Sequence, residues 1–475
     1  MATNYRHGVY IYENPTSLLP PVNVDSAVQV AVGVGCVNNS LAEDVLEPQI
    51  AYSYSEAVDK MGMANDLMNY PLCQVTKASF ELYGIAPVIY INVLDPTIHK
   101  KQVNSDVVSM ILENAIIEKD GVLLKSLVVK NEDGTVTYDE NVDYTIKIGA
   151  SNFPIITALT DGDITNDSVL SLDYEQLDPS MVTEDDVLAG IQKIDEVYPR
   201  FATIPGQIIS PGWSHKPGVA MALTGKTRFL NGCFRSFVWL DVDTEKANRY
   251  DKVYELKNKD NMVDEMSAVL WPCLKVGNDI FYYSALAGAH QALIDYQNES
   301  VPYESPSNKN LKVSGICLKD GTEIILDYER ANMLNGQGIC TATNLNGWKF
   351  WGNNTAIYPG STDVKDRFIP IRRMFTWWGN TFILTYFQKV DSPMNRRLIE
   401  TIIDSENIRA NGFVGSGKIA DAKIILDPSL TAVDLIDGRI KFLQYLTPFP
   451  PAEEIVNTLE FDPQALYDSV TGGID

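Results

Sequence analysis

Long apolar runs and helically spaced apolar residues alternate along most of the chain. Residues 26–37 (SAVQVAVGVGCV) and 87–94 (PVIYINVL) are apolar runs of strand length, typical of strands that are buried on both faces. Apolar residues with a helical spacing lie between and after such runs. The helices expected from this spacing are 54–62, 67–83, 184–198, 216–231 and 281–297. Strand and helix in alternation predict an α/β domain.

The pattern changes between residues 100 and 185, where short strands are separated by turns. The segment 131–134 (NEDG) has the composition of a hairpin loop. This part of the chain carries 17 Asp or Glu against 6 Lys. It contains no Asp-x-Asp-x-Asp-Gly loop followed by a glutamate at the twelfth position, so the acidic residues fit a solvated face better than a calcium site. We therefore expect an all-β module, inserted into the α/β domain and projecting into solvent.

An aromatic-rich stretch, residues 346–391, predicts a strand, a loop and a helix. It holds four of the seven Trp residues. Trp348–Trp351 fits a short strand, and the apolar residues that follow Pro370 have a helical spacing. Ser392 and Pro393 then predict the start of a further helix, with a hydroxyl cap followed by proline in the first turn. This stretch has the character of a core and contains no candidate catalytic group.

Both ends of the chain carry an alternating strand that a proline-rich spacer separates from the rest. Residues 8–13 (GVYIYE) precede three prolines, and residues 454–461 (EIVNTLEF) follow Pro448–Pro451. A tethered strand exposes backbone groups that favour pairing with another chain. An N-terminus that is disordered or locally packed is the alternative. The residues expected to exchange between subunits are Val9, Tyr10, Ile11, Tyr12, Ile455, Val456, Leu459 and Phe461.

Length and composition exclude several classes of protein. A chain of 475 residues with 45% hydrophobic and 21% charged residues is expected to fold into two to four soluble domains. A net charge of −24 argues against nucleic acid as a partner. No apolar run reaches the ~20 residues of a membrane helix, and the N-terminus lacks the apolar core of a signal peptide. The six scattered Cys fit buried thiols in a reducing cytoplasm.

No motif in the sequence supports catalysis. Gly225-Lys226-Thr227 ends like a phosphate-binding loop, but Ala220 stands where the motif needs glycine, and the segment lies inside a predicted helix. The glycines of residues 33–35 lack the third glycine of a dinucleotide site, because that position is Asn38. The four His have no metal-ligand spacing. We expect a protein that is not an enzyme and that has no cofactor and no metal.

A basic segment, residues 365–441, contrasts with the acidic chain, because it holds 12 Lys or Arg against 9 Asp or Glu. One interpretation is that its arginines lie on solvated helix faces with local ion pairs. The other is a basic surface that faces an acidic partner. The candidates for that surface are Arg372, Arg373, Arg396 and Arg397.

Several of these motifs resemble contractile-tail sheath proteins, which build the contracting sleeve of phage tails and related injection particles. Residues 8–37 match the family's G-V-Y-x-x-E arm, proline spacer and small-residue strand. Residues 306–309 (PSNK), 347–355 (GWKFWGNNT) and 393–398 (PMNRRL) resemble its C-terminal part. The match covers residues 8–37 and about 300–461, and is poorest in the segment 100–185.

The resemblance implies a structural subunit that polymerises into a helical sleeve around an inner tube and contracts to drive that tube through a cell envelope. The implied partners are further copies of the chain, the inner tail tube protein, and the baseplate and tail terminator proteins. It favours a tube-facing role for the four arginines. The implied location is a virion tail or injection particle assembled in the bacterial host cytoplasm. The alternatives are a non-contractile baseplate or fibre component, and a hydrolase that uses paired carboxylates.

The expected organisation is an α/β multidomain protein with an inserted all-β domain and two strand-donating arms. Its parts are an N-terminal arm (1–25), a discontinuous α/β domain (26–99 and 186–340), an acidic β insert (100–185), a C-terminal α/β domain (341–451) and a C-terminal arm (452–475).

Overall fold

A computed structural model of the chain describes residues 24–38 and 45–472. Its centre is an eight-stranded sheet in the order β18-β17-β13-β12-β11-β1-β3-β2. The six inner strands are parallel, and the edge strands β2 and β18 are antiparallel to their neighbours. The strands are β1 (Gln29–Gly33), β2 (Gln49–Ala51), β3 (Val88–Asn92), β11 (Gln207–Ile209), β12 (Val238–Asp241), β13 (Ser267–Leu270), β17 (Ile339–Asn344) and β18 (Trp348–Trp351).

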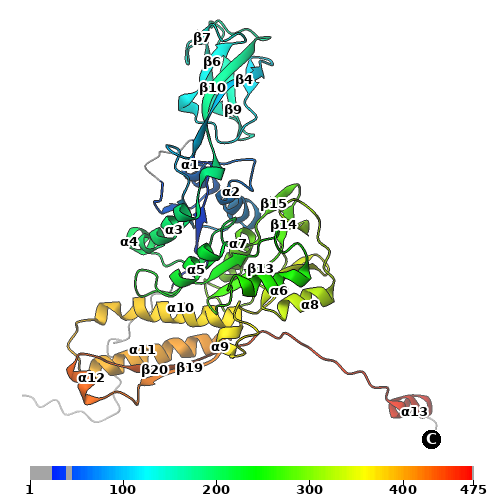
Figure 1. The fold of residues 1–475 in the computed structure, drawn as a ribbon. Coiled ribbons are helices and arrows are strands. Elements are labelled where there is room, and N and C mark those ends of the chain that lie inside the picture. Colours follow the sequence, from blue (N-terminus) through cyan, green and yellow to red (C-terminus); the bar gives the residue numbers. More distant parts are fainter. Residues whose placement is uncertain (1–23, 39–44, 473–475) are drawn as a thin grey trace, which may run out of the picture.

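Helices cover this sheet, as the alternating pattern predicts (Figure 1). In register, Val30 of β1 aligns with Ile208 on one side and Ile89 on the other, and all three side chains are buried. The α/β prediction is confirmed. The helices are α1 (Tyr54–Met61), α2 (Pro71–Thr76), α3 (Glu184–Gln192), α4 (Val197–Phe201), α5 (Pro217–Lys226), α6 (Tyr250–Lys259), α7 (Tyr283–Gln297) and α8 (Tyr328–Asn335). A small sheet, β14 (Cys273–Val276), β15 (Asp279–Phe281) and β16 (Gly315–Cys317), lies beside them.

Residues 100–177 form two small antiparallel sheets at one end of the molecule, far from the C-terminal layer (Figure 1). The only other regular element between these bounds is the short 3-10 helix Leu124–Ser126. The sheets enclose a hydrophobic cluster of their own that includes Val129, Ile156 and Leu172. The strands are β4 (Lys100–Ser109), β5 (Asn114–Ile116), β6 (Val128–Asn131), β7 (Thr137–Tyr138), β8 (Tyr144–Ile148), β9 (Pro154–Ala158) and β10 (Val169–Leu177).

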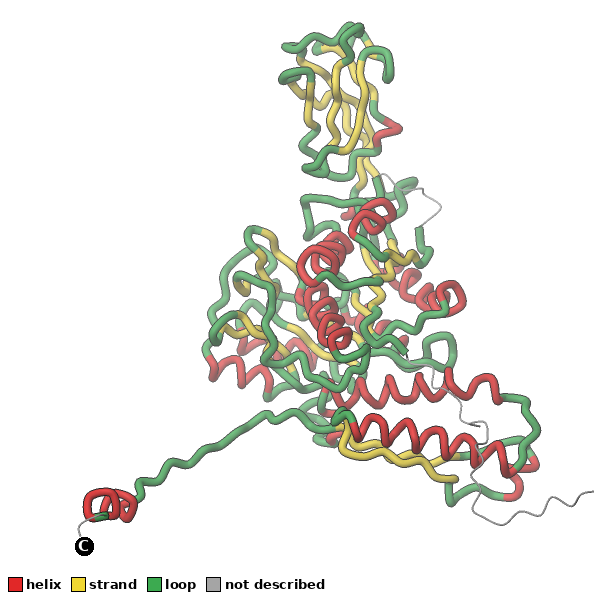
Figure 2. The backbone as a smooth tube through the Cα atoms, turned by 180° about the vertical axis from the view of Figure 1, so that it is seen from behind, coloured by secondary structure: helices red, strands yellow, loops and turns green. Residues whose placement is uncertain are grey.

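The opposite end is a layer of two long helices over a two-stranded hairpin (Figure 2). Trp377 and Trp378 from one helix pack edge to face against Phe413 from the other, which joins the two helices through an aromatic core. The elements are α9 (Val364–Arg367), α10 (Ile369–Tyr386), α11 (Arg396–Gly415), β19 (Ile419–Leu426), α12 (Ala432–Ile436), β20 (Phe442–Pro448) and α13 (Pro463–Thr471).

Three predicted element boundaries are wrong. The helix expected from Ser392 begins at Arg396, because Asn395 caps it by accepting a hydrogen bond from Leu398 N at 2.9 Å. The helix expected at 67–83 begins only at Pro71 and changes into a π-helix over Lys77–Tyr83. The helix expected at 216–231 ends at Lys226. Gly225 lies within that helix, as predicted, so its backbone N–H cannot form a phosphate loop.

Candidate assembly interface

The chain leaves the body after Pro448 as an extended segment and ends in the separate helix α13 (Figure 1). Ile455 and Leu459 are each 88% exposed, and Phe461 is 74% exposed. Residues 454–461 form no strand in this single chain, because no strand among the described residues lies alongside them. Large apolar side chains exposed to water on an extended segment make these residues a candidate interface. The predicted arm begins at residue 452, but Glu453 is ion-paired with Arg367 of the body. From here on, the name C-terminal arm is used for residues 454–472.

Helix α13 is a part of this arm that the strand pattern did not reveal. Asp462 caps it by accepting hydrogen bonds from Gln464 N and Ala465 N, and Pro463 occupies its first turn. This aspartate and proline are a helix-start signature that the sequence carries. Leu466, Tyr467 and Val470 are all more than half exposed, so the helix leaves its apolar side chains uncovered.

The hairpin of β19 and β20 offers an open sheet edge. Ile424 of β19 bonds sideways to Asn407 of α11: Ile424 N donates to Asn407 Oδ1 at 3.0 Å, and Asn407 Nδ2 donates to Ile424 O at 3.3 Å. Ile424 is paired with Gln444 of β20. Because the N–H and C=O of Ile424 point away from β20, this is a non-hydrogen-bonded pair, and the N–H and C=O of Gln444 point away from β19. No strand pairs with that side of β20 in the described part of the chain. Asn407 therefore occupies part of the β19 edge of the hairpin, and among the described residues the β20 edge has no strand paired with it.

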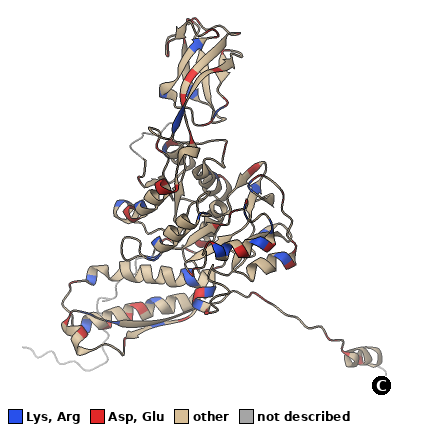
Figure 3. Ribbon diagram, viewed as in Figure 1, with Lys and Arg blue, Asp and Glu red and all other residues tan. Residues whose placement is uncertain are grey.

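The four candidate arginines separate into two pairs. Arg396 and Arg397 are exposed in the first turn of α11, and Arg396 is ion-paired with Glu400 at 2.6 Å. Acidic residues lie on the same helix, so the charge there is mixed rather than uniformly basic (Figure 3). Cations near a helix N-terminus oppose its dipole, and the ion pair offsets part of that cost.

Arg372 and Arg373 are not on a solvated face, and the prediction that they lie on a basic surface is wrong. They are 6% and 3% exposed. Arg373 forms a two-pronged ion pair with Asp295 of α7, at 3.0 and 2.5 Å, and Asp295 is itself fully buried. Arg372 pairs with Asp366 at 3.1 Å, and burial lowers its pKa. The sequence shows two adjacent charges but not a carboxylate 78 residues away.

The predicted exchange residues of the N-terminus, Val9, Tyr10, Ile11 and Tyr12, lie outside the described residues.

Comparison with known proteins places these surfaces in context. No family model matches the chain. The tail sheath protein of Burkholderia phage BcepMu is 25% identical, and the alignment covers all of both chains. A putative prophage major tail sheath protein of Pseudomonas aeruginosa is 26% identical over 56% of this chain and 67% of its own length.

The chain is a homologue of tail sheath proteins. A solved structure with a similar fold is the sheath complex of PVC, an extracellular contractile injection system, in its contracted state. It has a TM-score of 0.60 and 15% sequence identity, and the match covers 98% of this chain and 100% of that one. The resemblance drawn from the motifs is thus confirmed.

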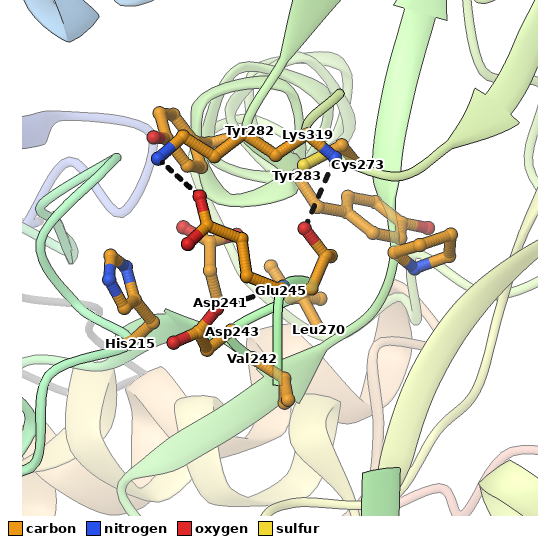
Figure 4. A pocket seen from close by; sticks show the side chains of 12 residues that line it. His215, Asp241, Val242, Asp243, Glu245, Leu270, Cys273, Tyr282, Tyr283 and Lys319 are labelled. Atoms are coloured by element: carbon orange, nitrogen blue, oxygen red, sulfur yellow. Dashed lines mark hydrogen bonds and ion pairs between the residues drawn. The ribbon is translucent and has the colours of Figure 1, made fainter. Parts of the chain in front are cut away.

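In this sheath homologue, the crevice where an α/β enzyme would bind its substrate is almost filled. It lies at the carboxyl end of β12, beside His215 and Asp241 (Figure 4). Its free volume is about 40 Å³, whereas small-molecule sites are typically ~300–1,000 Å³. Within residues 24–38 and 45–472, no group of three or more His, Cys, Asp or Glu is arranged to hold a metal ion. None of the helices in that part of the chain is both long and apolar enough to cross a membrane.

Asp241 acts as a structural tie in this crevice. Its carboxylate accepts hydrogen bonds from Ser284 N at 2.8 Å, Ser284 Oγ at 2.5 Å and Ser214 Oγ at 3.1 Å. Burial raises the pKa of Asp241 to about 6, although the bonds from Ser284 and Ser214 oppose the rise. The bonds join the end of β12 to the segment that follows β11 and to the first turn of α7. All six Cys are free thiols, and only Cys233 is exposed.

The raised pKa of Asp241 predicts a pH effect on stability. A carboxyl with a pKa of about 6 when folded and ~3.9 when unfolded contributes stability that is fully present below pH ~4 and is lost as pH rises through 6. When the pH is raised from 4 to 7, the free energy of unfolding of wild type should therefore fall by ~2–3 kcal/mol relative to that of Asp241→Asn. Urea unfolding at both pH values measures this difference, and an equal difference at both would contradict it.

Proposed function

We propose that this chain is the subunit of a contractile sheath that polymerises into a helical sleeve around an inner tube. The observation that carries the proposal is the presence, on one chain, of an exposed arm and an unpaired sheet edge. The arm begins at residue 454, and Pro450 and Pro451 hold its approach extended. It leads away from β20 of its own chain (Figure 1). On this proposal, the arm pairs with the sheet edge of another subunit. A head-to-tail contact of this kind builds an open helix rather than a closed pair.

Shortening of this sleeve would drive the inner tube through the envelope of a target cell. The arms keep neighbouring subunits connected while the bodies move against each other, because extended segments permit reorientation that a rigid interface would prevent. Better packing between bodies supplies the work, and the mechanism needs no cofactor. The particle is a phage tail or a related injection machine, with the baseplate and tail terminator as further partners.

We infer that residues 100–185 form the inserted domain on the outside of this sleeve. The insert lies at the end of the molecule opposite the α10–α11 layer (Figure 1) and has its own hydrophobic cluster. Its excess of acidic residues favours solvation rather than burial between subunits. The remaining proposed parts are the discontinuous α/β domain, 26–99 with 186–340, and the C-terminal domain, 341–451. The limit between them falls within β17, so β18 and most of β17 belong to the C-terminal part by sequence and to the central sheet by pairing.

A backbone substitution on β20 tests strand exchange. Leu446 lies two residues after Gln444, so its N–H also points away from β19. Leu446→Pro removes that donor, and we expect the concentration needed for polymerisation to rise at least tenfold. Leu446→Val is the matched control, because it trims the side chain and retains the N–H. Sedimentation of polymer from subunits measures both, and equal values for the two variants would exclude β20 as the acceptor edge.

A charge reversal tests whether the exposed arginines face the tube. We expect Arg396→Glu with Arg397→Glu to reduce co-sedimentation with purified tube by about tenfold, and to change sleeve formation without tube much less. Low salt should enlarge the difference, because the Debye length is then longer. Lys441, which is ion-paired with Asp434 at 2.7 Å, supplies a control of similar charge in Lys441→Glu. Unchanged tube binding by the double variant would remove Arg396 and Arg397 from the tube interface.

A further inference from the structure

The segment 367–377 contacts two other parts of the chain: the residue that precedes the C-terminal arm, and the first residues that the structure describes. At the C-terminal side, Arg367 forms an ion pair with Glu453, the last residue before the C-terminal arm. Arg367 is also held in place itself. Its Nε donates to Asn354 Oδ1 at 2.9 Å, and its guanidinium lies 4.6 Å from the ring centres of Tyr358 and Phe368.

The same segment holds the first described residues of the chain. Trp377 Nε1 donates to Val24 O at 2.7 Å, and Arg373 Nη2 donates to Ser26 O at 3.2 Å. Both contacts are buried. Arg373 and Trp377 are one helical turn apart, so they present their donors from the same face of α10. Ser26 Oγ donates to Ser300 O at 2.7 Å, so Ser26 is bonded both to α10 and to the loop that follows α7.

We propose that residues 367–377 are a common mount for both arms: Arg367 fixes the point where the C-terminal arm leaves the body, and Arg373 and Trp377 fix the chain at Val24 and Ser26. This proposal rests on the sheath function proposed above and deepens it. Arg367 is the last residue of α9, and Arg373 and Trp377 lie on α10, which begins two residues later. A pull on one arm therefore reaches the other through residues 367–377 without crossing the eight-stranded sheet. Arg367 acts here as a positioning residue.

The mount sets the reach of the C-terminal arm. Pro448 is buried and residues 452–460 are exposed, so Glu453 is the last tie to the body. Breaking the Arg367–Glu453 pair frees the five residues 449–453, which adds up to ~17 Å of chain. A longer tether lowers the effective concentration of the strand at the neighbouring edge. The pair therefore increases the affinity of one subunit for the next without adding a contact between them.

A mutant cycle on full-length protein tests the C-terminal root. We expect Arg367→Gln and Glu453→Gln each to raise the critical concentration for polymerisation about three- to tenfold. The double variant should equal either single variant, because all three break the same contact. Arg367→Lys should lie between wild type and Arg367→Gln, since it keeps the charge and loses the planar fork. The control is Arg249→Gln, which breaks the exposed pair with Asp251. Critical concentrations that are unchanged in the single variants, or effects that add in the double variant, would overturn this proposal.

Two further measurements separate this proposal from the sheath function. Trp377→Phe retains an aromatic side chain but loses the indole N–H that donates to Val24 O, and we expect a similar rise in critical concentration. Spin labels on cysteines placed at Thr322 and Asn457, with Cys233 replaced by Ser, report the arm in unassembled subunits. Their distance distribution should broaden in Arg367→Gln, and an unchanged width would overturn the mount even if the chain never polymerised. Wild-type protein that stays unassembled at every concentration would contradict the sheath function alone.

Discussion

Removal of residues 454–475 is expected to abolish polymerisation and to leave a folded subunit. The described part of this segment is exposed at every residue, so its loss should change the free energy of unfolding by less than ~0.5 kcal/mol. Glu453 stays in place, and with it the ion pair to Arg367. Sedimentation and negative-stain microscopy measure the assembly, and urea unfolding measures the stability.

Two controls sharpen this deletion. A chain that ends at Gly472 keeps the strand residues and α13 and should assemble like wild type. A chain that ends at Asp462 keeps Ile455, Val456, Leu459 and Phe461 but lacks the helix, and so divides the contribution of the strand from that of α13. Sleeves that formed from the chain ending at Glu453 would show that the C-terminal arm does not connect subunits.

Loss of the Arg373 guanidinium is expected to cost about 3–5 kcal/mol of stability, because it leaves Asp295 charged and buried. Burial raises the pKa of Asp295, and Arg373 opposes that rise. Without Arg373, the protonated form should be tolerated better than the charged form. The cost of Arg373→Met should therefore be smaller at pH 4 than at pH 8.

A second substitution distinguishes this electrostatic effect from lost packing. Arg373→Met with Asp295→Asn removes both charges and leaves an amide oxygen for Gln291, which donates to Asp295 Oδ1 at 2.7 Å. We expect the double variant to recover at least ~2 kcal/mol at pH 7. Arg396→Met, at an exposed position, should change stability by less than ~0.5 kcal/mol. A double variant as unstable as Arg373→Met would assign the loss to packing.

The sequence predicts elements well where local spacing is strong. Helix α10 follows from the spacing of Ile371, Met374 and Trp378, and β1 and β3 follow from continuous apolar runs. The sequence prediction fails where a residue's position depends on a partner far away in the sequence or on another chain. Two adjacent arginines look like surface charge until Asp295 is folded against one of them. The strand predicted at residues 454–461 is absent from the single chain, and its formation on a second chain stays a prediction.

Of the candidate assembly interface, the sequence predicts the exposed arm but not the open sheet edge. The proline spacer and the alternation at Ile455 and Leu459 predict an arm from sequence, and the structure shows it exposed. The acceptor edge cannot be found in this way, because it depends on Asn407 of α11 occupying one side of the hairpin. The sequence prediction contains no helix after the alternating residues 454–461, although Asp462 and Pro463 mark the start of α13.

Electron microscopy of the purified full-length protein tests the central claim most directly. At high concentration we expect hollow striated sleeves, and a reconstruction from them should show a strand from residues 454–461 of one subunit paired with β20 of another. Sleeves in which β20 pairs with no foreign strand would contradict the exchange mechanism. Protein that remains monomeric at high concentration, with both arms intact, would contradict the sheath function itself.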